Sequence, residues 1–148
     1  MMKYSARLSD AMHLLAFIYI NPKQNLSSAV IAVSIHTNPS YVRQLMMALR
    51  KSGILKSTRG QAKPELTRPP EQITMLDVYR AVEGSKPLLH LDTNINPDCN
   101  VGIHIQYTLR EYYEKVQKTA EGEMANITLA DIIRGFYQRA AGQEMIWD

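Results

Sequence analysis

Cysteine is almost absent from this sequence: Cys99 is the only one among 148 residues. A single thiol excludes an intrachain disulfide and is typical of a reducing compartment. Long hydrophobic runs are also missing, because the longest, residues 11–20, is interrupted by His13 and reaches only about half of the roughly 20 residues that cross a membrane. The same segment lacks the basic flank and the small-residue cleavage site of a signal peptide. We therefore expect a cytoplasmic protein without a membrane partner.

The motifs that usually mark an enzyme are missing as well. There is no glycine-rich phosphate loop, since Gly60 stands alone, and neither a GxSxG nor an HExxH motif occurs. The residues that could hold a metal match no standard zinc spacing; they are His90, Asp98, Cys99 and His104. The sequence therefore predicts neither an enzyme nor a metal site.

Acidic residues are scarce in the first half of the chain. Residues 1–70 contain 10 Lys and Arg but only 2 Asp and Glu, a net charge of +8. Residues 71–148 contain 7 Lys and Arg and 12 Asp and Glu, a net charge of −5, so that the whole chain carries +3. A basic half of this kind is typical of a nucleic-acid binder. The alternative is a solvated surface that happens to be basic.

Residues 27–51 are predicted to form two short helices joined by a tight turn. Ala32, His36 and Val42 match the helix-turn-helix spacing of a small residue, a turn residue and a buried β-branched residue. The turn position favours a positive φ, which His tolerates less well than Gly. The second helix opens at Asn38-Pro39, where Asn caps the helix and Pro occupies its first turn. The alternative is an ordinary helical hairpin.

The second of these helices has two different faces. One carries Val42, Leu45, Met46 and Leu49, and the other carries polar and basic side chains without a carboxylate. This pattern predicts that Ser40, Arg43 and Gln44 contact base edges. Further contacts with the DNA backbone or minor groove are predicted for Lys3, Arg7, Tyr41, Lys51, Arg59 and Lys63. The alternative is a protein-interaction module. Its exposed helix face would be expected to carry more aliphatic side chains, and here only Met47 is of that kind.

The flanking segments complete a winged helix-turn-helix domain. A first helix over residues 3–20 ends at Asn21-Pro22. Strand-like runs at 54–59 and 65–67 enclose a basic turn, which is the expected wing. A stiff Arg68-Pro69-Pro70 linker leads to a helix over 75–83, capped by Thr74 and closed by Gly84. Residues 85–100 are predicted to be an irregular loop.

Residues 101–127 are predicted to form one long helix. Ile105, Leu109, Tyr112 and Val116 recur at near-heptad spacing, and Ala120, Met124 and Ile127 continue the stripe. Such a stripe favours a dimerisation helix, and packing against the protein's own domain is the alternative. A last helix over 129–140 begins at a capping box of Thr128 and Asp131. We expect the apolar cluster at 145–147 to dock elsewhere on the protein.

Two stretches, SSAVIAVSIHTNPSYVRQLMMALRKSGILKSTRG and PPEQITMLDVYRAVEG, resemble the Rrf2 family of bacterial winged-helix repressors, which includes IscR, NsrR and CymR. The resemblance covers residues 1–84, and residues 97–133 are similar in layout. It implies a homodimer formed by the long helix, recognition helices in two major grooves of an inverted-repeat operator, and wings on minor grooves. The wing tip departs from the family's glycine-rich form. Many members hold an iron–sulfur cluster on three cysteines, and this chain has only Cys99, so no cluster is predicted unless His or Asp substitutes.

The sequence thus predicts a mainly α fold with a small β-wing, in which a winged helix-turn-helix domain is followed by a long dimerisation helix. Residues 1–84 form the DNA-binding domain, 85–100 a loop suited to sensing, and 101–148 the dimerisation and C-terminal helices. The expected function is a homodimeric repressor that binds double-stranded DNA. Cys99, at the start of the long helix, is a candidate redox sensor. The sequence does not identify an effector.

Overall fold

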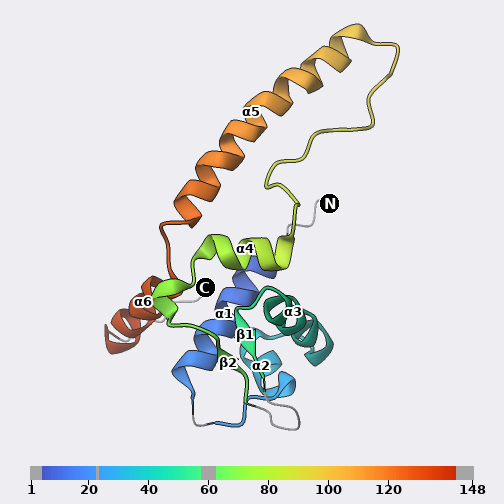
Figure 1. Ribbon diagram of the computed structural model, residues 1–148. Helices are drawn as coiled ribbons and strands as arrows, with labels where there is room; N and C mark the ends of the chain where they lie inside the picture. Colours follow the sequence, from blue (N-terminus) through green and yellow to red (C-terminus); the bar gives the residue numbers. More distant parts are fainter. Residues whose placement is uncertain (1–4, 23, 58–62, 143–148) are drawn as a thin grey trace.

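The structure, a computed structural model, describes residues 5–22, 24–57 and 63–142. It is mainly helical with a small two-stranded sheet, as predicted. In Figure 1 the other helices gather at one end, while α5 extends away from them and the loop before it runs alongside. The elements in chain order are α1 (Arg7–Ile20), α2 (Ser28–Ile35), α3 (Pro39–Lys51), β1 (Leu55–Lys56), β2 (Glu65–Leu66), η1 (Pro70–Gln72), α4 (Met75–Glu83), α5 (Asn100–Met124) and α6 (Leu129–Gly142).

Helix α1 forms the centre of the hydrophobic core. Its residues Ala11, Leu14 and Leu15 are fully buried, because α1 packs against α2, α3, α4, α6 and β2. The start of α6 joins the same core through Leu129 and Ile133. One core therefore holds the helix-turn-helix, the wing strands and the C-terminal helix together.

The helix starts follow the local signals in the sequence. Ser27 and Asn38 cap α2 and α3, accepting hydrogen bonds from the backbone N–H groups of Val30 and Tyr41 at 3.3 and 2.9 Å. Thr74 opens α4 in a complete capping box, and Thr128 exchanges the same pair of hydrogen bonds with Asp131 at the start of α6. These caps satisfy N–H groups that a helix leaves without intrahelical partners.

The wing strands are shorter than predicted. β1 and β2 pair antiparallel with Leu55 opposite Leu66 and Lys56 opposite Glu65. In this register Pro64 is the next residue opposite Ser57, and it has no N–H to donate to the ladder, which accounts for the end of β1 at Lys56. The return strand begins at Glu65 as predicted and ends one residue early, at Leu66. The wing tip with Arg59 lies outside the described residues.

Two helix ends differ from the prediction because of contacts between distant segments. Helix α1 begins at Arg7 rather than residue 3, since the Ser5 hydroxyl donates to the Glu83 carboxylate at the end of α4. Helix α5 ends at Met124 rather than Ile127. The Ile127 carbonyl accepts from the Met75 N–H at 2.7 Å, and this pairing turns the chain into α6. Ile127 therefore does not continue the α5 stripe.

Arg68 and Asp77 fasten the predicted linker to the start of α4. The Arg68 guanidinium donates to the Asp77 carboxylate at 3.0 Å and to the Gln72 carbonyl at 2.8 Å. Burial alone would raise the pKa of Asp77, but hydrogen bonds from Thr74 and Arg68 outweigh it and hold that pKa below its ordinary value. The linker is thus not free, and Pro70 is buried as the first residue of η1.

We predict that Asp77→Ala lowers the free energy of unfolding by about 1 kcal/mol at pH 7, mainly through loss of the capping box. The ion pair adds little, because the Asp77 side chain is 40% exposed. Since the folded pKa is lowered, the stabilisation is present above the unfolded pKa of about 4 and disappears as the pH falls through the folded value. Urea unfolding at pH 7 and pH 3 measures both effects.

The matched control is Asp98→Ala, which removes an exposed loop carboxylate that makes no side-chain hydrogen bond or ion pair with the described residues. It should leave the urea midpoint unchanged at both pH values. Equal midpoints for Asp77→Ala and the wild type at pH 7 would contradict the role given to Asp77.

Candidate nucleic-acid interface

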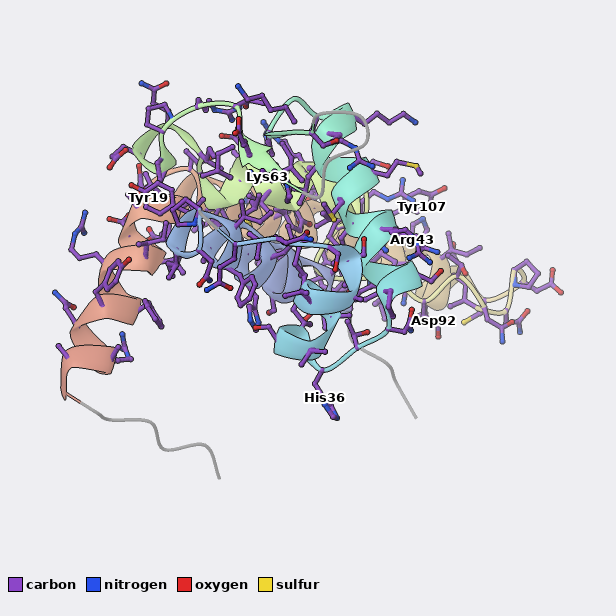
Figure 2. All side chains as sticks on the ribbon, turned by 90° about the horizontal axis from the view of Figure 1, so that it is seen from below. Tyr19, His36, Arg43, Lys63, Asp92 and Tyr107 are labelled. Carbon is purple, nitrogen blue, oxygen red and sulfur yellow. The ribbon has the colours of Figure 1, made fainter. Side chains whose placement is uncertain are left out.

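Helix α3 presents a polar and basic face to solvent, as predicted. On its inner side Val42, Leu45 and Leu49 are fully buried, and Met46 is nearly so. The outer side chains are exposed, and Figure 2 shows Arg43 among them along α3. The exposed set is Ser40, Arg43, Gln44, Met47, Arg50 and Lys51.

The turn between α2 and α3 holds this face in place. His36 adopts the left-handed conformation with φ of 64°, and the Thr37 N–H donates to the Ala32 carbonyl at 2.9 Å. Ala32 is buried at the contact between the two helices, which also pack through Ser28 and Met46. The predicted helix-turn-helix is therefore formed, and His36 projects from the end of α2 (Figure 2).

The charges on this face are available to a partner. Arg43, Arg50 and Lys51 form no ion pair within the described part of the chain. On the wing, Lys63 is exposed, whereas Lys56 faces Glu65 at 3.7 Å in a solvent-exposed pair that contributes little. A face with free cations and hydrogen-bond donors but no carboxylate is suited to a polyanion.

Tyr41 and Arg7, both predicted to contact DNA, are bound within the protein. The Tyr41 hydroxyl donates to the Asp10 carboxylate on α1 at 2.8 Å. Burial, together with that hydrogen bond and the Asp10 charge, raises the pKa of Tyr41 to about 12, so the hydroxyl stays protonated. The Arg7 Nε donates to the Val82 carbonyl at 2.9 Å. These contacts hold α1 against α3 and α4.

Within the part of the chain that the structure describes, the apolar stripe of α5 over residues 105–116 is not covered by the protein's own domain. Ile105, Tyr112 and Val116 are about half exposed, Leu109 is partly buried, and Met124 at the end of the helix is the one buried residue of α5. The loop before α5 lies on a different side of the helix, where the Gln117 side chain accepts from the Leu88 N–H at 2.9 Å and donates to the Tyr79 hydroxyl at 3.1 Å. Among the described residues, the stripe therefore packs on the protein's own domain only at its end, at Met124.

Comparison with known families gives the class of the protein. The model of the Rrf2 family, described as an iron-dependent transcriptional regulator, matches residues 4–135. The chain belongs to the Rrf2 family. It is therefore a transcriptional regulator of a DNA-binding winged-helix family and not an enzyme, which confirms the predicted family and class.

Relatives of this Rrf2 protein agree with that assignment. YwnA of Bacillus subtilis (strain 168), named as a helix-turn-helix transcriptional regulator, is 38% identical over 133 residues, which cover 90% of this chain and 98% of YwnA. A crystal structure described as that of a DNA-binding protein is 37% identical with a TM-score of 0.70, covering 86% of this chain and 98% of that one. IscR of T. potens is 25% identical with a TM-score of 0.65, covering 99% and 94%.

The residues near Cys99 do not fit the iron–sulfur cluster found in many Rrf2 proteins. Cys99 is the only cysteine in the chain. Among residues 5–22, 24–57 and 63–142, no three His, Cys, Asp or Glu side chains form a group that could hold a metal ion. Within those residues, His90, Asp98 and His104 therefore form no such group with Cys99.

Cys99 instead caps α5. Its exposed Sγ accepts from the Gly102 N–H at 3.4 Å, at the start of a helix whose N–H groups point toward it. The thiol is therefore in contact with the N-terminus of α5 and is also accessible to solutes.

The described part of the chain contains no helix that is both long and apolar enough to span a bilayer.

Some residues that hold the interface in place were missed at the sequence level. Asp10 gives a faint signal, as one of two acidic residues in the first 70. Tyr79, Gln117 and the Arg80–Glu121 ion pair, 3.2 Å long, join α4 to α5. Their partners lie about 40 positions away, so no local pattern could have identified them.

Proposed function

We propose that this Rrf2 protein is a homodimeric repressor that binds an inverted-repeat DNA operator through α3. The observation that carries the proposal is the exposed face of α3, which combines unpaired cations with side chains able to read bases. Because a bacterial operator lies in the cytoplasm, we expect the protein to be cytoplasmic.

The side chains of this face divide into two roles. Ser40, Arg43 and Gln44 lie in the first half of α3, which enters the major groove in helix-turn-helix proteins, and they would contact base edges. Lys51 and Lys63 would contact phosphates, as would Lys3 and Arg59, which lie outside the described residues. Tyr41 and Arg7 would act mainly by fixing α1 against α3 and α4.

Gln44→Ala and Lys51→Ala separate these roles. We expect Gln44→Ala to weaken binding to the operator by about 1–3 kcal/mol while binding to random DNA is kept. Lys51→Ala should weaken binding to both DNAs alike and lower the slope of log K against log salt by about one. Fluorescence anisotropy across a salt series measures both. If the two variants lost the same affinity on both DNAs, the assignment of roles would be wrong.

The exposed stripe of α5 supports a second copy of the chain as the dimer partner. The helix is about 37 Å long at 1.5 Å per residue, and its apolar side chains repeat at near-heptad spacing along one side. A two-fold axis across two such helices would place two α3 helices in opposite orientations. That arrangement reads an inverted repeat, with half-sites about one helical turn or a multiple apart.

Two tyrosines of α5 provide a matched test of this dimer. Tyr112 lies in the stripe, whereas Tyr107 is on the opposite side of the helix; they are 57% and 60% exposed, and each lies beside a cationic side chain. We expect Tyr112→Glu to produce a monomer, because a carboxylate would be buried in the interface. Operator affinity should then fall roughly 100-fold through loss of the second half-site.

Tyr107→Glu should leave both the dimer and the operator affinity unchanged. Sedimentation velocity gives the oligomeric state, and anisotropy gives the affinity. A monomeric wild type, or two variants that both remain dimers, would contradict the proposed interface.

We further propose that regulation in this chain does not use an iron–sulfur cluster, since Cys99 is the only cysteine. A redox response through Cys99 is a second candidate function, favoured by its exposed thiol at the helix end. Hydrogen peroxide would oxidise the Cys99 thiol to a sulfenic acid, with one peroxide oxygen transferred to sulfur and the other released as water.

We expect peroxide to change the operator affinity of the wild type, reversibly with a thiol reductant, and to leave Cys99→Ser unaffected. Anisotropy before and after treatment measures the response. A wild type that does not respond would eliminate Cys99 as a sensor, and equal responses in both proteins would place the oxidised group elsewhere.

A further inference from the structure

Met47 is the one large apolar side chain on the exposed face of α3. It is 61% exposed, while the neighbouring Met46 takes the buried position in the core at 7%. At about 100° per residue, Met47 falls between Arg43 and Gln44, near the middle of the face. The structure thus places an apolar group where the rest of the face is polar or basic.

This side chain does not belong to an apolar docking patch. Its neighbours on the face, Ser40, Arg43, Gln44 and Lys51, are all exposed polar or charged residues. The face therefore offers a partner protein a single apolar side chain surrounded by polar and cationic ones, which does not favour protein docking. Met47 also has no donor for a phosphate, so it cannot share the role of Lys51. What remains for it on a DNA-facing surface is an apolar contact with a base.

The major groove offers one apolar group of this kind, the 5-methyl of thymine. A methionine side chain is long, flexible and polarizable, so its thioether can reach and pack on a methyl group. Gln44, three residues earlier on the same face, has the amide that pairs with the N6 and N7 edge of adenine. Each of the two side chains is therefore complementary to an A·T pair, Gln44 through the adenine and Met47 through the thymine.

The spacing of the two side chains fits neighbouring base pairs. Three residues of helix rise about 4.5 Å, and adjacent base pairs of DNA are about 3.4 Å apart. Gln44 and Met47 would therefore address successive steps of the same half-site.

We propose that Met47 packs on a thymine 5-methyl group in the major groove, one step from the adenine read by Gln44, so that each operator half-site contains adjacent A·T pairs opposite the middle of α3. This proposal rests on the proposed DNA-binding function and adds which base pairs α3 selects.

The test begins with selection of binding sequences from a random duplex library by the full chain. Each thymine of the selected sequence is then replaced by deoxyuridine, which removes only the 5-methyl group. We expect one thymine per half-site at which this replacement weakens wild-type binding about fourfold, the effect of roughly one buried methyl group. Anisotropy measures the ratio of the two affinities.

Met47→Ala and Met47→Gln should bind the thymine and deoxyuridine duplexes equally, since the alanine methyl is too short to reach the methyl group from this position and glutamine would present a polar amide to it. Both substitutions are at an exposed position and should fold as the wild type does. The matched control is Val33→Ala, which removes an 82% exposed apolar side chain from α2 and should keep the wild-type ratio.

The outcomes separate this inference from the proposed function. An enriched sequence in which every thymine can be replaced without loss would overturn the inference alone, as would a Met47→Ala variant that keeps the wild-type ratio. A library that yields no enriched sequence would overturn the proposed function, and this inference with it.

Discussion

The burial of one stripe of α3 is the interaction on which the rest of the interface depends. Val42, Leu45 and Leu49 are removed from water against α1 and its neighbours, each with a favourable free energy of about 1.5–3 kcal/mol. Because side chains on a helix are fixed relative to one another, this burial determines which side chains face outward. The turn at His36 and the hydrogen bond between Tyr41 and Asp10 then fix how α3 sits on the domain.

The second constraint is the attachment of α5 to this domain. Side chains connect α4 to α5 through the Tyr79–Gln117 hydrogen bond and the Arg80–Glu121 ion pair. The backbone hydrogen bonds between the segments around Ile73 and Ile127 fix where α5 ends. In a dimer built on the α5 stripe, these contacts would set the distance between the two α3 helices. The Arg80 side chain is 64% exposed, so the ion pair by itself contributes little, whereas Tyr79 is buried and anchors the contact between α4 and α5.

Local chemistry predicted much of the fold. Asn38, Thr74 and Thr128 mark helix starts because a side-chain oxygen and the nearby N–H groups are all that a cap requires. The two faces of α3 followed from helical periodicity in the same way. The apolar stripe over residues 105–116 is exposed, which agrees with the prediction of a dimerisation helix without testing the partner.

The errors arose where distant segments meet. Ser5 contacts Glu83, which no pattern within α1 indicates, and α1 begins at Arg7 rather than at the predicted residue 3. Ile127 fits the α5 stripe but is drawn into backbone pairing with Met75. In each case a tertiary hydrogen bond outweighs a weak local preference.

The most direct test of the central claim is fluorescence anisotropy of the full chain on DNA from upstream of its own gene, with a scrambled duplex of the same composition, across a salt series. If α3 reads DNA, the upstream fragment will bind tightly at salt concentrations where the scrambled duplex is released, and both affinities will fall steeply with log salt. Failure to bind either duplex even at low salt would contradict the claim that the exposed face of α3 is a DNA-binding surface.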